Sequence, residues 1–206
     1  MGDSSQVIVL ASRSPRRVEL LTEFLAPLQL TFETVPADID ETPLRGETPE
    51  DYVRRCAVEK SSVVAKRLHD ANLSADVVVI GADTTVDVGG QIFGQPNDVA
   101  DAADMLRQLS GRSHRVWTAV SIRRGNRHKD GIDRAMVTMV PITEELLTWY
   151  LNTGESLGKA GAYAAQGEGR RLVDRIDGNL ETVIGLPLGL VRDLASSVGA
   201  SWNLGR

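Results

Sequence analysis

The sequence predicts a single α/β unit in which helices flank one mixed, twisted sheet. Apolar runs of strand length alternate with segments of helical periodicity along the 206 residues, and we expect residues 1–206 to form one domain. The continuous apolar run at Asp76–Gly81 is typical of a strand covered on both faces. Two further strands, at Arg115–Arg124 and Asp133–Val140, follow one another without a helix, which excludes a purely parallel sheet.

The first half of the chain contains two shorter strands and two helices. The strands are expected at Val7–Ala11 and Leu30–Thr34. Between them, Ser14-Pro15 begins a helix, because Ser is a favoured N-cap and Pro a favoured first helical residue. After an acidic loop at Pro36–Gly46, the N-cap, Pro and first-turn carboxylates of Thr48–Asp51 begin a second, longer helix. Apolar residues at helical spacing give both helices a core face.

The second half of the chain begins with a predicted hairpin. Thr84–Val88 and Gln91–Phe93 flank Gly89-Gly90, a pair suited to a tight turn. A polar, basic turn is expected to join the two strands between residues 115 and 140. Helices are predicted at three further places: from Asp98 to about Leu109, from Thr143 to Gly154, and from about Leu188 to Val198.

Composition narrows the classes of function. The net charge of −5 and only nine aromatic residues disfavour a nucleic-acid-binding module. No apolar stretch approaches the roughly 18 residues of a membrane span, so no membrane partner is expected. The single cysteine, Cys56, cannot form an internal disulfide, and it falls on the apolar face of a predicted helix. We therefore expect a cytoplasmic globular protein.

The segment Ser12–Arg17 is the first candidate for chemistry, because it lies where a buried strand turns into a helix. Free backbone N–H groups at a helix start, two hydroxyls and three guanidinium groups suit a multiply charged phosphate. A capped helix with solvated surface arginines would have the same sequence. No Walker A pattern occurs in the chain, which disfavours P-loop chemistry.

Three further segments carry candidate groups, and each also has a purely structural interpretation. Asp83 ends the most apolar strand, where a carboxylate could bind a metal, take a proton from water, or simply cap a turn. The second segment is acidic, and its carboxylates could bind magnesium or manganese, or could simply be solvated on the surface. These residues are Glu33, Asp38, Asp40 and Glu41. In the third, Gly158–Gly169, four glycines and Gln166 would allow close approach to a flat ligand, or a flexible loop.

Taken together and in this order, the segments resemble the Maf family of nucleoside triphosphate pyrophosphatases. The motifs that carry the resemblance are Leu10-Ala-Ser-x-Ser-Pro-Arg-Arg17, Phe32-Glu33, Asp40-Glu41, Ala57-x-x-Lys60, Gly81-Ala-Asp-Thr84, Ser110-Gly-x-x-His-x-Val116 with Thr118, Lys159-Ala-Gly-Ala-Tyr163, Gln166-Gly167 and Gly185-Leu-Pro-Leu188. They span about residues 7 to 195. The form Ala-Tyr-x-x-Gln-Gly is similar to the branch that prefers dTTP and UTP.

The resemblance implies a Maf/ITPase-like fold with a central cleft, usually found as a homodimer. It implies hydrolysis of dTTP and UTP, and of modified pyrimidine nucleotides, to the monophosphate and pyrophosphate with Mg2+, Mn2+ or Co2+. By position, Asp83 would accept the proton of the attacking water. The resemblance also implies that substrate choice depends on Arg16, Thr84 and Gln166. It implies that the cleft is lined by Ser12, Arg17, Glu33 and Lys60, and that the metal is bound by Glu33 and Asp83.

One departure from the family pattern concerns the phosphates. Relatives usually carry Lys before the Pro that follows the hairpin, whereas this chain has Gln95-Pro96. A charged hydrogen bond to phosphate is worth about 1.5 to 3 kcal/mol, enough to change activity tenfold. We hypothesise that Arg13 partly replaces the missing cation. Two alternatives stay open: the same reaction with another base specificity, and a nucleotide-binding regulator of cell division or septum formation with weak turnover.

Overall fold

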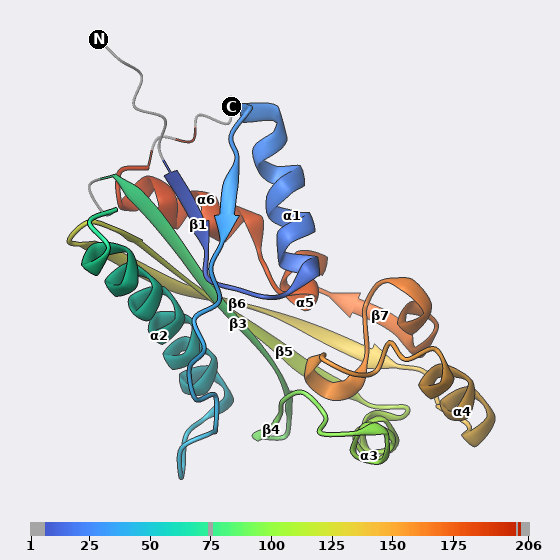
Figure 1. Cartoon of the computed structure of the whole chain (residues 1–206). Coiled ribbons are helices and arrows are strands. Elements are labelled where there is room, and N and C mark those ends of the chain that lie inside the picture. Colours follow the sequence, from blue (N-terminus) through green and yellow to red (C-terminus); the bar gives the residue numbers. More distant parts are fainter. Residues whose placement is uncertain (1–6, 74–75, 201, 203–206) are drawn as a thin grey trace.

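The computed structural model describes residues 7–73, 76–200 and 202. Its centre is one seven-stranded sheet in the order β2-β1-β3-β5-β6-β7, with β4 paired to the far end of β3 (Figure 1). The strands are β1 (Val7–Leu10), β2 (Phe32–Thr34), β3 (Val77–Val88), β4 (Gln91–Phe93), β5 (Ser113–Arg124), β6 (Arg127–Met139) and β7 (Val173–Asp177). β1 pairs in parallel with β2 and β3, and the other pairs are antiparallel, so the predicted mixed sheet is confirmed.

Helices cover both faces of the sheet. The α-helices are α1 (Pro15–Leu25), α2 (Pro49–Asp70), α3 (Val99–Leu109), α4 (Glu144–Asn152), α5 (Leu180–Ile184) and α6 (Leu188–Ser197). Shorter 3-10 helices are η1 (Ala26–Leu28), η2 (Ala160–Ala162) and η3 (Gly167–Leu172). The long helix α2 lies alone along one side of the sheet, whereas α3 and α4 lie at the end opposite to the chain termini (Figure 1). None of the described helices is long and apolar enough to cross a membrane.

The N-caps predicted at Ser14 and Thr48 are confirmed, and the predicted helices that begin at Asp98 and Thr143 are capped in the same way. The side chains of Ser14, Thr48, Asp98 and Thr143 each accept a hydrogen bond from a backbone N–H in the first turn of the helix that follows. Each bond satisfies one of the donors that a helix start leaves unpaired.

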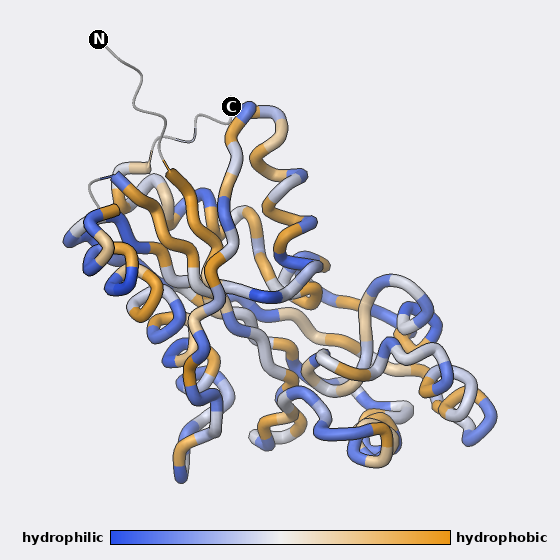
Figure 2. The backbone as a smooth tube through the Cα atoms, in the orientation of Figure 1, coloured by the Kyte–Doolittle hydropathy of each residue, from blue (hydrophilic) through white to orange (hydrophobic). Residues whose placement is uncertain are grey.

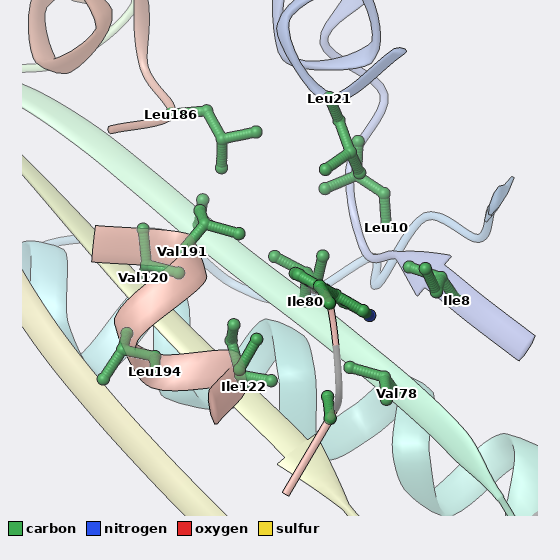
Figure 3. Packing of buried hydrophobic residues seen from close by; sticks show 14 of the residues in the cluster. Ile8, Leu10, Leu21, Val78, Ile80, Val120, Ile122, Leu186, Val191 and Leu194 are labelled. Atoms are coloured by element: carbon green, nitrogen blue, oxygen red, sulfur yellow. The ribbon is translucent and has the colours of Figure 1, made fainter. Parts of the chain in front are cut away.

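The largest apolar cluster packs α1 and α6 against β1, β3 and β5. Figure 3 shows its centre, in which Ile8, Leu10, Val78 and Ile80 of the sheet meet Leu21 and Val191 of the helices. Apolar residues follow one another along β1 and the first half of β3 (Figure 2), as expected for strands covered on both faces. Trp202 belongs to the same cluster and packs edge-on against Phe24, with 6.3 Å between ring centroids.

The sequence prediction was wrong about the extent of one strand. β6 begins at Arg127, six residues before the predicted start at Asp133, because Gly125 and Asn126 alone make the turn that follows β5. Gly125 has a φ of +55°, which suits a two-residue hairpin turn. Charged side chains at the start of β6 hid the strand pattern. The short elements β7 and α5 were not predicted, and the predicted strands on either side of Ala82-Asp83 are one continuous strand, β3.

Glycine at position 81 sets the distance between α2 and β3. A Cβ at this position would lie 2.4 Å from the carbonyl oxygen of Ala57 and 2.7 Å from the backbone nitrogen of Ser61, both in α2. Such distances are far below ordinary contact, so only glycine lets the helix approach this closely. Lys60 lies on the same turn of α2, and Asp83 lies two residues along β3 on the same face. The close approach therefore brings these two side chains together.

We expect Gly81→Ala to lower the free energy of unfolding by about 1–3 kcal/mol, because the new methyl group would push the backbone of α2 away from β3. Urea denaturation measures this change. Gly189→Ala is the matched control, since a Cβ at Gly189 would have no atom within 4 Å and Ala favours the helix. Equal midpoints for Gly81→Ala and the unmodified protein would contradict the close-packing argument.

Candidate active site

A cavity of about 1090 Å³ opens beside the middle of β3. β1 ends at Leu10, opposite Ile80, and β4 pairs with β3 only from Val86 onward. The edge of β3 between these two strands is therefore uncovered, and the cavity reaches Asp83 and Thr84, whose side chains point to opposite faces of the strand. This is the carboxyl end of the parallel strands, where α/β folds commonly bind ligands.

The loop Ser12–Arg17 lines one wall of the cavity, at the start of α1. Ser12 is buried, and its hydroxyl oxygen accepts from the backbone N–H of Ser14 at 3.1 Å. Ser14 in turn is the N-cap of α1. These hydroxyls thus shape the loop, and the positive end of the α1 dipole faces the cavity with the arginines beside it.

Arg17 is bound within the protein rather than extended into the cavity. Its Nε donates to the carbonyl oxygen of Gly185 at 2.8 Å and its Nη1 to that of Ala82 at 3.0 Å. Its Nη2 donates to Thr84 Oγ1 at 3.0 Å. Gly185 has a φ of +123°, and a Cβ there would lie 3.3 Å from Arg17 Nε. Arg17 therefore ties α1 to β3 and to the end of α5, and burial lowers the pKa of its guanidinium.

A buried ion pair lies at the inner end of the cavity. Lys60 Nζ is 2.6 Å from Asp83 Oδ1 and 3.0 Å from Glu41 Oε2. Asp83 is 4% exposed, and its other oxygen, Oδ2, has no hydrogen-bond partner among the described residues. Burial raises the pKa of the Asp83 carboxyl above its ordinary value, against the opposing positive charges of Lys60 and Arg17. The carboxylate is thus a stronger base than an exposed aspartate.

Another part of the cavity wall is the loop that follows α4. Lys159 and Gln166 both line the cavity there, and so does Arg16 from α1. Glu155 shapes this loop, because its carboxylate accepts from the backbone N–H groups of Glu168 at 3.2 Å and of Gly169 at 3.1 Å. Burial lowers the pKa of the Lys159 ammonium, and the nearby charge of Arg16 lowers it further. This wall therefore adds cationic groups whose charge is only partly compensated by Glu155.

The structure brings nearly all of the predicted site residues to one cavity. Those on its wall are Ser12, Arg13, Arg16, Arg17, Lys60, Asp83, Thr84, Gln95 and Gln166. Glu33 is the exception: it is exposed on β2 and does not line the cavity. Its register explains the position, since Glu33 pairs with Val9, inside β1, rather than with the loop after β1. The function expected of Glu33 therefore stays a prediction, and the cavity as it stands does not include this side chain.

Arg13 and Gln95 lie on the cavity wall with exposed side chains. Arg13 Nη2 is 2.5 Å from Asp38 Oδ1, a contact between the Ser12–Arg17 loop and the acidic loop before α2. The backbone N–H of Gly161 donates to the carbonyl oxygen of Gly94 at 3.0 Å, which joins the segment before Gln95 to the loop that carries Lys159.

The donor set at the cavity fits a divalent cation held jointly with phosphates. No group of three or more His, Cys, Asp or Glu side chains within residues 7–73, 76–200 and 202 is arranged to hold a metal. Magnesium, however, is commonly bound by one or two carboxylates together with substrate phosphates. Asp83 Oδ2 is an unpartnered, buried oxygen on the cavity wall, and Glu41 lies next to it across Lys60. Glu41, which lines the cavity, would be the second carboxylate of such a site.

Two groups at the site were not singled out individually by the sequence analysis. Glu155 carries no sequence signal beyond its place after the predicted helix stop at Gly154. His114 appeared only inside a motif. It is buried, and its Nε2 lies 2.8 Å from the hydroxyl of Tyr163, which forms part of the cavity wall. Burial lowers the pKa of His114 to about 4, so the ring is neutral near pH 7.

Comparisons with known proteins relate the chain to one family. The family model described as Maf-like protein matches residues 7–198. A dTTP/UTP pyrophosphatase of Myxococcus xanthus (strain DK1622) is 45% identical over 92% of this chain and 91% of its own. A dTTP/UTP pyrophosphatase of Shewanella oneidensis is 42% identical over 93% of this chain and 98% of its own. Among solved structures, a HAM1 protein from Coxiella burnetii has 19% identity and a TM-score of 0.47, covering 65% of this chain and 73% of that one.

We expect acid to destabilise the protein through His114. Its pKa of about 4 in the folded state lies below the value of 6.5 for an unperturbed histidine, so the unfolded state binds the proton more readily. Stability is full above pH 6.5 and falls as the pH drops toward 4, by about 3 kcal/mol in total. The measurement is the free energy of unfolding between pH 7 and pH 4 for the unmodified protein and for His114→Gln. The free energy of unfolding should fall less in the variant. If the free energy of unfolding fell equally with pH in both proteins, His114 would not be the cause of the acid destabilisation.

Proposed function

The chain belongs to the Maf family, and from that premise we propose that it hydrolyses dTTP and UTP to the monophosphate and pyrophosphate. The observation that carries the proposal is the buried Asp83 carboxylate, whose Oδ2 is unpartnered among the described residues and which shares a cavity with the Ser12–Arg17 loop. The names of the relatives support dTTP and UTP as the substrates. Modified pyrimidine nucleotides, removed before they are incorporated into nucleic acid, would suit the same site.

Asp83 is the group that activates water in this proposal. The oxygen of a water molecule attacks the α-phosphorus of the substrate, and Asp83 Oδ2 accepts a proton from that water. The bond between the α-phosphorus and the oxygen bridging to the β-phosphate breaks, and pyrophosphate leaves with the electron pair. Lys60 holds Oδ1 at 2.6 Å, which fixes the orientation of the carboxylate and leaves Oδ2 free for water. The raised pKa of Asp83 makes it the better proton acceptor.

Cationic side chains stabilise the charge that develops on the phosphates. Arg13 and Lys159 lie on the cavity wall, and a preorganised guanidinium or ammonium group favours the transition state most where water is excluded. The guanidinium of Arg17 acts from a fixed position, because its hydrogen bonds to Ala82, Thr84 and Gly185 hold it in place. The helix start at Ser14 adds backbone N–H groups.

A divalent cation, Mg2+, Mn2+ or Co2+, would be held by Asp83 and Glu41 together with phosphate oxygens. When bound, it supplies Lewis-acid stabilisation of the phosphoryl oxygens. Two further proposals rest on the family alone. We propose a homodimer and a cytoplasmic location, as the resemblance to this family implies.

We expect Asp83→Asn to lower kcat/KM for dTTP by about 10²–10⁴-fold, because an amide accepts no proton from water. The measurement is pyrophosphate release from natural and modified nucleoside triphosphates with Mg2+, Mn2+ or Co2+. Asp174→Asn, at an exposed position of β7, is the matched control and should retain full activity. Full turnover by Asp83→Asn would exclude this mechanism. Nucleotide binding by the unmodified protein without turnover would instead favour a regulatory function.

We expect Arg13→Ala to lower kcat/KM by about tenfold, because one charged phosphate contact is worth 1.5 to 3 kcal/mol. Gln95→Lys should raise kcat/KM and make Arg13 less important, since it restores the cation found in relatives. Initial rates for the two single variants and the double variant measure both effects. An unchanged kcat/KM in Arg13→Ala would end the idea that Arg13 compensates for Gln95.

A further inference from the structure

A chain of hydrogen bonds determines what the hydroxyl of Thr84 offers to a ligand. Thr84 lies on the cavity wall, and Arg17 Nη2 donates to its Oγ1 at 3.0 Å. Thr118 Oγ1, on the neighbouring strand β5, lies 2.9 Å from the same oxygen. Thr118 Oγ1 also lies 2.6 Å from the backbone carbonyl oxygen of Thr182 in α5. Thr118 itself is fully buried, so it does not contact a ligand.

The direction of each hydrogen bond in this chain follows from the end at Thr182. A carbonyl oxygen only accepts, so the single hydroxyl proton of Thr118 goes to Thr182. Thr118 therefore presents a lone pair to Thr84, and Thr84 donates its own proton to Thr118. Arg17 uses one of the two lone pairs on Thr84. One lone pair remains for a ligand, and Thr84 therefore accepts a hydrogen bond from the ligand and cannot donate one.

Thr84 lies between two chemically different parts of the cavity. Asp83, the preceding residue, marks the charged part with Lys60. Val86 lies two residues farther along β3 on the same face as Thr84 and lines an apolar part of the wall with Val116 and Tyr163. Flat, largely apolar ligand groups prefer such surroundings. A nucleotide with its phosphates at the charged part would thus place its base beside Thr84.

We propose that Thr118 is a positioning residue that fixes Thr84 as a hydrogen-bond acceptor, so that Thr84 selects the N3–H of thymine or uracil. The edge of these bases presents an acceptor, a donor and an acceptor. Arg16 and the amide of Gln166, on the same cavity wall, offer donors for the two carbonyl oxygens.

Cytosine presents the opposite polarity at the decisive atom. Its unprotonated N3 would face the remaining lone pair of Thr84, and neither atom would have a proton to share. A site that leaves a buried polar group unpaired rejects such a ligand strongly. This inference rests on the proposed function and deepens it, because it names the atom of the base that is recognised and the residue that sets the polarity.

The first test uses the unmodified protein and three substrates: dTTP, dCTP and 3-methyl-dTTP, in which a methyl group replaces the N3 proton. We expect kcat/KM to fall at least a hundredfold from dTTP to either of the others. A 3′-deoxy analogue of dTTP, which keeps N3–H and lacks the sugar hydroxyl, should be hydrolysed like dTTP. Loss of activity with this analogue together with retention with 3-methyl-dTTP would overturn the proposal, because Thr84 would then accept from the sugar.

The second test changes the polarity without touching the ligand. Thr118→Val keeps the side-chain shape and removes the hydroxyl, so the proton of Thr84 becomes available to a ligand acceptor. We expect the preference for dTTP over dCTP, as a ratio of kcat/KM values, to fall at least tenfold. Thr118→Ser keeps a hydroxyl and should restore the original ratio. A merely structural function of Thr118 would lower both rates together and leave their ratio unchanged, which would refute the proposal.

Two controls separate the failure of this inference from other failures. Thermal unfolding of Thr118→Val and Thr118→Ser establishes that each variant folds. The comparison of substrates uses only the unmodified protein, so its result is valid even if Thr118→Val does not fold. If the unmodified protein released no pyrophosphate from dTTP, the proposed function itself would fail. If it hydrolysed dTTP and dCTP equally well, the proposed function would survive in broader form and the inference about Thr84 would be wrong.

Discussion

The contact between Lys60 and Asp83 is the interaction on which the rest of the site depends. Both side chains are buried, and an ion pair in such surroundings exists only because the cost of removing two charges from water is offset by short, well-oriented contacts. The 2.6 Å distance requires α2 to lie unusually close to β3, and glycine at position 81 permits that approach. Backbone packing thus determines the orientation and basicity of a single carboxylate.

The unequal lengths of neighbouring strands make that carboxylate accessible. β1 stops opposite Ile80 while β3 continues to Val88, which leaves an uncovered strand edge next to the start of α1. Side chains from both faces of β3 reach the cavity at this edge, although a strand normally separates them. Asp83 therefore contacts Lys60 on one face of β3, while Thr84 contacts Arg17 on the other. The two side chains are adjacent in the strand, yet each has its own hydrogen-bond partners.

The sequence predicted the features that have local causes. Helix starts at Ser14 and Thr48 and the Gly89-Gly90 turn follow from capping and turn chemistry. The gathering of distant motifs around Asp83 came from the family resemblance. Contacts that depend on register could not be predicted: Glu33 shares a motif with cavity residues, yet its pairing with Val9 places it elsewhere. Likewise, the residues around Arg17 in the sequence do not indicate that its guanidinium donates hydrogen bonds to Ala82, Thr84 and Gly185.

The charge of the cavity wall bears on how a triphosphate is held. Within the part of the chain that the structure describes, five cationic side chains line it, Arg13, Arg16, Arg17, Lys60 and Lys159, against four anionic ones, Asp38, Glu41, Asp83 and Glu155. Several of the cations are already paired, as Arg13 is with Asp38 and Lys60 with Asp83 and Glu41. A ligand with about four negative charges is therefore poorly compensated by the protein alone, and carboxylates beside its phosphates would repel it. The carboxylates of the wall would hold a divalent cation together with the phosphates, and the cation would supply the positive charge that the protein lacks, so these acids fit a metal-assisted reaction better than simple phosphate binding.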